Sequence, residues 1–137
     1  MHVTLTITGT QTGEDNESMT IATRTEGEYF ERSNSTYLLY DETDPDDGSV
    51  TKNMLKLSGG ALSLSKKGAV NSNMTWEEGK TIVSDYSSAF GRLMLSVKTK
   101  RLHICDSEEE LHLEVNYRLS VEDTFLSDNS LSIHVQK

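Results

Sequence analysis

The chain of 137 residues has one cysteine, one proline and one tryptophan, and it has no long apolar run. Cys105 has no second cysteine to pair with, so a disulfide framework is excluded and a reducing, cytoplasmic location is favoured. No segment approaches the roughly 20 apolar residues that a membrane-spanning helix needs. The first residues alternate between polar and apolar types, unlike a secretory signal. We therefore expect a cytoplasmic protein with no membrane partner.

Basic side chains are scarce, because 13 Lys and Arg face 22 Asp and Glu for a net charge of -9. Proteins that bind phosphate backbones carry clustered Lys and Arg, and here the only cluster is Lys98, Lys100 and Arg101. Nucleic acid is therefore not expected as a partner. The sequence also lacks the phosphate-loop, serine-hydrolase and zinc-protease signatures. Enzyme activity stays open, but the sequence names no catalytic residue and no cofactor.

Large aliphatic and Phe side chains are few: Leu, Ile, Val and Phe make up about 23% of the chain, against the roughly 20% below which disorder is expected. Their arrangement favours folding, since Val3, Leu5 and Ile7 alternate with polar neighbours in the two-residue period of a strand. The length suits one domain, residues 1–137, with a core that needs no disulfide or metal. Besides the first strand, we expect strands at 19–25, 29–32, 36–42, 50–57, 61–65, 70–76, 80–85, 92–104, 111–119 and 130–135.

Short turns separate these strands, as at Ser58-Gly59-Gly60 and Lys66-Lys67-Gly68, where glycine can take the positive φ of a tight connection. No window shows a convincing helical stripe. Many short strands in one small domain predict a barrel or a sandwich, with an antiparallel meander as the simplest order. Gly27, inside the stretch 19–32, can let a strand bend at a barrel corner.

An ordered set of blocks spans nearly the whole chain: Gly27-Glu28-Tyr29, Tyr37 to Glu42, Thr51-Lys52, Leu55 to Leu57, Lys67 to Val70, Tyr86 to Leu95, Thr99, and the pair Tyr117 and Leu119. In this order and spacing the sequence resembles the YwiB-like family of uncharacterised bacterial proteins. The resemblance implies an all-β fold, a single antiparallel calycin-like, lipocalin-resembling β-barrel of about eight to ten strands in the cytoplasm. It implies no activity, ligand or catalytic residue.

Two segments have the residue types of metal sites. In the acidic loop from Asp41 to Gly48, the positions where a calcium loop needs its first oxygen ligands are Thr43, Pro45 and Asp47, so a solvated hairpin loop is the better interpretation.

The second segment is a hairpin in which one register pairs His103 with His112, and His134 or Glu114 could complete a metal site. An outward polar face is favoured there, because Leu111, Leu113 and Val115 take the inward positions. We therefore predict no metal site.

Cys105 and His103 share one strand face, as a thiol and its base would. Acidic residues follow Cys105, Asp106 and Glu108 to Glu110, and negative charge beside a thiol disfavours the reactive thiolate. An inert thiol is the favoured interpretation.

The remaining candidates are aromatic: Tyr29, Tyr37, Tyr40, Trp76, Tyr86, Phe90 and Tyr117. They can line a cavity in which Arg92 holds an anionic group, or they can simply fill a small barrel. As ligand-binding residues we select Tyr37, Tyr86, Arg92 and Tyr117.

Three functions stay open, in this order. The first is a non-enzymatic barrel that binds a small apolar or amphipathic ligand. The second is a regulatory or protein-interaction module with a filled core, and the third is an enzyme with an unrecognised site. The sequence does not decide between a monomer and a homodimer.

Overall fold

The computed structural model describes all residues from Met1 to Lys137 and contains ten strands and no helix. No helix long and apolar enough to cross a membrane is found. The all-β prediction of eight to ten strands is confirmed, although the stretches 19–25 and 29–32 form one continuous strand. The strands are β1 (His2–Thr12), β2 (Ser18–Arg32), β3 (Ser35–Thr43), β4 (Val50–Ser58), β5 (Ala61–Lys67), β6 (Asn71–Glu77), β7 (Thr81–Ser88), β8 (Gly91–Asp106), β9 (Glu110–Val121) and β10 (Thr124–Gln136).

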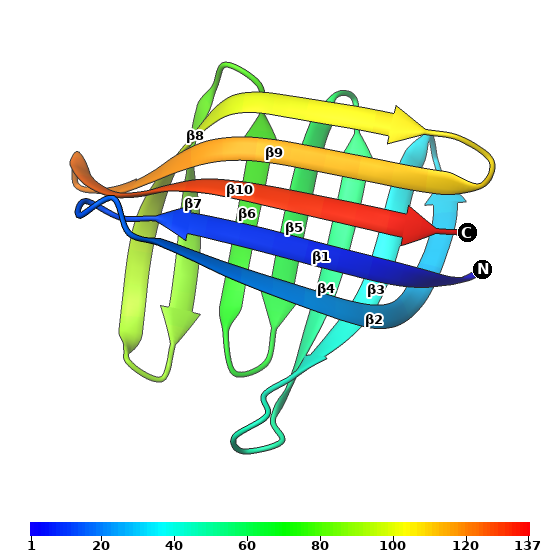
Figure 1. Ribbon diagram of the computed structural model, residues 1–137, viewed down its shortest axis with the longest axis horizontal. Coiled ribbons are helices and arrows are strands. Elements are labelled where there is room, and N and C mark those ends of the chain that lie inside the picture. The colour runs from blue at the N-terminus through cyan, green and yellow to red at the C-terminus, as the bar shows by residue number, and fades with distance from the viewer.

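Each strand pairs antiparallel with the next in sequence, and β1 pairs with β10 to close the barrel. The predicted meander is therefore confirmed. Figure 1 shows β1, β2, β9 and β10 running side by side across the front, while β3 to β7 run steeply behind them. The turns are tight because their residues adopt positive φ, as Gly59 (57°) and Gly60 (81°) do between β4 and β5.

The core is one cluster of 15 buried residues inside the barrel, contributed by nearly every strand. Alternation explains it, since Val3 and Leu5 of β1 point inward while His2 and Thr4 point outward. The same period places Leu111, Leu113 and Val115 of β9 inside. The lean aliphatic content suffices because only one face of each strand needs apolar side chains.

β2 curves sharply at one end of the barrel (Figure 1), and Gly27 is the residue of β2 at which its pairing with β3 begins. A Cβ atom at this position would lie 2.4 Å from the carbonyl oxygen of Leu39 and 2.8 Å from Cδ1 of Leu5. Glycine is required because the neighbouring strand crosses at this distance. The bend does not interrupt β2, because β1 pairs with it continuously from Ser18 to Glu28.

Beyond this bend, β2 and β3 separate. Their pairing covers Gly27–Arg32 of β2 and Ser35–Tyr40 of β3, so residues 18–26 of β2 pair only with β1. The barrel wall is therefore open between the first half of β2 and the last residues of β3.

Candidate functional site: a cavity at the open side of the barrel

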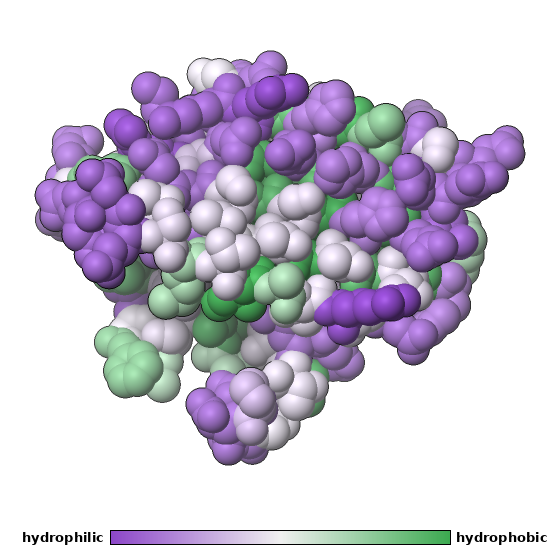
Figure 2. Space-filling model, viewed as in Figure 1, coloured by the Kyte–Doolittle hydropathy of each residue, from purple (hydrophilic) through white to green (hydrophobic).

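A cavity of about 530 Å³ lies inside the barrel where β2 has left β3. Its 18 lining residues come from the first half of β2, the ends of β3 and β5, and the inner faces of β1, β6, β7, β9 and β10. Figure 2 shows a hollow below the front strands β1 and β2, with apolar surface visible between the protruding β3–β4 and β7–β8 hairpins. The volume lies within the roughly 300–1,000 Å³ of small-molecule sites.

Trp76 and Tyr117 form the aromatic inner end of the cavity. Their ring centroids are 5.3 Å apart with a tilt of 58°, and Trp76 is only 1% exposed. The indole Nε1 of Trp76 is buried without a hydrogen-bond partner. Burial raises the pKa of Tyr117 to about 12 and also raises that of Tyr40, where the nearby Glu42 carboxylate adds to the effect. Both phenols therefore stay neutral at physiological pH.

The walls are largely apolar and leave open space beside Gly9. Ile7, Ile21, Met74 and Leu131 line them. Gly9 follows Val3, Leu5 and Ile7 at the next inward position of β1, and a Cβ atom there would meet no atom within 4 Å. The cavity therefore exists partly because this inward position carries no side chain.

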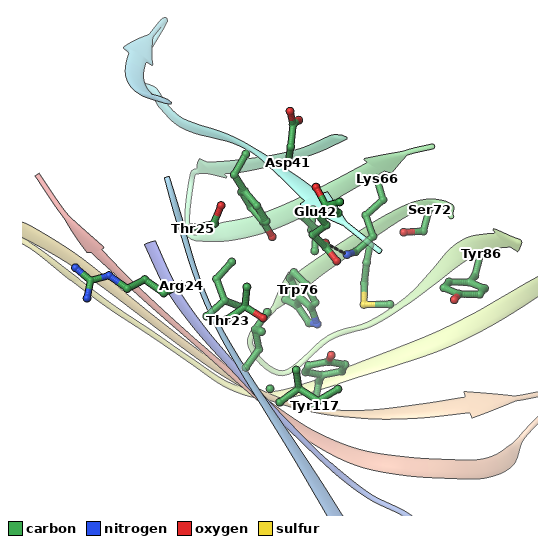
Figure 3. A pocket seen from close by; sticks show the side chains of 18 residues that line it. Thr23, Arg24, Thr25, Asp41, Glu42, Lys66, Ser72, Trp76, Tyr86 and Tyr117 are labelled. Atoms are coloured by element: carbon green, nitrogen blue, oxygen red, sulfur yellow. Dashed lines mark hydrogen bonds and ion pairs between the residues drawn. The ribbon is translucent and has the colours of Figure 1, made fainter. Parts of the chain in front are cut away.

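An ion pair between Glu42 and Lys66 stands at the mouth. Both side chains occupy inward positions, Glu42 two residues after the buried Tyr40 and Lys66 two residues after Leu64. Figure 3 shows the pair joined above Trp76, with Tyr86 and Ser72 on one side and Thr23 and Thr25 on the other. The Lys66 side chain is 25% exposed, so it is a largely buried cation that already has its counterion.

Beside the mouth, the acidic β3–β4 loop uses its carboxylates to form its own turn. Oδ1 of Asp44 accepts from the backbone N–H of Asp46 at 2.8 Å, and Oδ1 of Asp47 accepts from that of Ser49 at 2.8 Å. Hydrogen bonds from Ser49 lower the pKa of Asp47. Asx turns of this kind explain the conformation of the loop without a cation.

The structure brings together two of the four residues selected from the sequence. Tyr86 and Tyr117 line the cavity. Tyr37 lies on the outer face instead, stacked on Phe30 with ring centroids 5.0 Å apart. It points outward because the inward positions of β3 belong to Leu38 and Tyr40.

Arg92 also lies outside the cavity. On β8 the inward positions are Leu93, Leu95 and Val97, so Arg92 points outward and its Nη2 lies 3.0 Å from Oδ1 of Asp85 on β7. It is 71% exposed and cannot reach a ligand inside the barrel.

The expected pairing of His103 with His112 is wrong by two residues. His112 pairs with Cys105, and His103 pairs with Glu114. His112 instead lies beside His134 of β10, with ring centroids 6.2 Å apart. These side chains bond to different partners, His112 to Oγ of Ser132 and His134 to Glu110. No group of three His, Cys, Asp or Glu residues is placed to hold a metal ion.

Comparison with known proteins places the chain in a family. Residues 5–133 match DUF1934, a domain of unknown function. The chain belongs to this family. Among proteins similar to this chain, the uncharacterised β-barrel protein YwiB of Bacillus subtilis (strain 168) is 32% identical over 110 residues, which cover 80% of this chain and 76% of YwiB. The crystal structure of ywiB protein from Bacillus subtilis matches with a TM-score of 0.86 and 27% identity, over 98% of this chain and 90% of that chain.

This match confirms the resemblance to the YwiB-like family and the barrel fold. It brings no activity to this DUF1934 chain, since the family is one of unknown function.

Sequence reasoning missed several residues of the site in this DUF1934 barrel. Gly9 could have been found, because a glycine at an inward position of an otherwise apolar strand signals missing side-chain volume. Glu42 and Lys66 could not, because their contact depends on the register of three strands.

Proposed function

We propose that the barrel binds a small amphipathic molecule in the cavity and does not catalyse a reaction. The open space beside Gly9, lined by apolar side chains and an aromatic inner end, is the observation that carries this proposal. Burying the apolar part of a ligand there would contribute about 25 cal/mol per Å² of area removed from water. The alternative, a protein-interaction module, requires a filled core, so the cavity favours ligand binding over that alternative. The proposal keeps the protein in the cytoplasm, where the exposed Cys105 stays reduced.

The most direct experiment is native mass spectrometry of the protein purified from its own host. A small molecule that co-purifies in repeated preparations is the expected result. Repeated recovery of bare protein would count against the proposal.

A cavity-filling variant tests the location of binding. Gly9→Leu places an apolar side chain in open space, and we expect it to weaken binding of the neutral dye Nile red at least tenfold while the barrel stays folded. Thr8→Leu is the matched control, because Thr8 points away from the interior on the same strand. If Gly9→Leu does not fold, Gly9→Val replaces it. Equal dye affinity in the Gly9 variant and the control would refute the proposed site.

A further inference from the structure

The inner end of the cavity holds one hydrogen-bond donor, the indole N–H of Trp76, that has no acceptor. The indole Nε1 of Trp76 can only donate, and it is buried without a partner. Figure 3 shows this nitrogen on the edge of the ring nearest Tyr117, and the Tyr117 hydroxyl on the edge nearest Trp76. A buried donor without an acceptor destabilises the fold, so a ligand that places an acceptor atom here recovers that free energy on binding.

The mouth of the cavity disfavours anions. Its one inward-pointing cation, Lys66, is already paired with Glu42. The other basic residue of the lining, Arg24, points away from the cavity in Figure 3. Asp41 also lines the mouth, the acidic loop from Asp44 to Asp47 follows, and the whole chain has a charge of -9. A free carboxylate or phosphate would therefore enter against repulsion and find no unpaired cation inside.

We propose that the ligand is uncharged, with an apolar body and an acceptor oxygen, such as a carbonyl, that receives a hydrogen bond from the indole N–H of Trp76. This inference rests on the proposed function and specifies its ligand class. It follows from the unpartnered donor at the inner end and the acidic mouth.

The experiment uses the single tryptophan of the chain, which gives one indole N–H resonance in a nitrogen-15 correlation spectrum. Titration with 2-decanone should move the indole proton downfield in a saturable way. Decanoate, of similar length but anionic, should bind at least tenfold more weakly at pH 7, and the difference should shrink in high salt because salt screens the acidic mouth.

Trp76→Phe separates the hydrogen bond from the aromatic contact. Affinities are measured by displacement of Nile red for 2-decanone and for 1-decene, which has no acceptor oxygen. The substitution should lower the affinity for 2-decanone about threefold to tenfold more than it lowers the affinity for 1-decene, as expected for the loss of one neutral hydrogen bond.

Two outcomes would overturn the ligand class while leaving the binding function intact: displacement of Nile red by 2-decanone with an unmoved indole proton, or decanoate bound as tightly as 2-decanone. If none of the three compounds displaces the dye, the ligand class is refuted. If Gly9→Leu also leaves dye binding unchanged, the proposed function is refuted with it.

Discussion

The sharpest test of the barrel corner is the replacement of Gly27 by alanine. The added methyl group would lie 2.4 Å from the Leu39 carbonyl oxygen and 3.2 Å from Cβ of Tyr40. A backbone oxygen cannot swing aside as a flexible side chain can, so β2 and β3 must move apart. Overpacking of this kind costs about 1–3 kcal/mol, and we expect the upper end of this range because the clash involves backbone.

Gly9→Ala is the matched control, since Gly9 also points inward on the adjacent strand but its Cβ would meet nothing within 4 Å. Urea unfolding followed by Trp76 fluorescence measures the stability of both variants, because this single tryptophan is 1% exposed in the fold and becomes exposed on unfolding. A loss of about 3 kcal/mol corresponds to a midpoint lowered by about 1.5 M for a typical urea dependence of about 2 kcal/mol per molar. If the two variants unfold within about 0.5 kcal/mol of each other, the close-approach explanation of Gly27 is wrong.

Two further stability predictions follow from the contacts. Because burial raises the pKa of Tyr117 to about 12, the folded state holds this proton more tightly than the unfolded chain, in which tyrosine titrates near 10. Stability from this group is therefore complete below about pH 10 and is lost as the pH rises towards about 12, by up to about 2 kcal/mol. In urea unfolding between about pH 9 and about pH 11.5, the free energy of unfolding of Tyr117→Phe should fall less steeply with pH than that of the unsubstituted protein. An equal pH dependence in the two proteins would contradict this explanation. Nζ of Lys137, a side chain only 9% exposed, donates to Oδ1 of Asp106 at 2.8 Å and lies 4.6 Å from the Tyr29 ring centroid. Lys137→Ala should cost about 1–3 kcal/mol in thermal or urea unfolding, whereas the exposed Lys98→Ala control should change stability by less than about 0.5 kcal/mol. Equal effects of the two substitutions would show that the Lys137 contacts contribute nothing.

Much of the fold could be predicted from the sequence because strand periodicity is local. Val3, Leu5 and Ile7 show their inward face without any knowledge of their neighbours. The same rule, applied strictly, places Tyr37 and Arg92 outside, since each adjoins an inward leucine. Their aromatic and cationic side chains have the chemistry of ligand-binding residues, but alternation keeps them out of the interior.

The pairing of His103 required information that alternation does not contain. The length of the β8–β9 turn sets which residue of β9 faces it, since the pairing runs without interruption from Asp106 and Leu111 to His103 and Glu114. A shift of two residues keeps every side chain on the same face, so the sequence pattern is equally compatible with both registers.

The sequence by itself determined the all-β class and favoured the antiparallel meander as the simplest strand order, because backbone period, turn chemistry and composition are properties of neighbouring residues. Only the tertiary structure decided that the interior contains a cavity, that Glu42 and Lys66 meet at its mouth and that the indole of Trp76 is left unpartnered. These features depend on where β2 departs from β3 and on how ten strands close around a shared interior. Such contacts join residues far apart in the chain, and no local pattern records them.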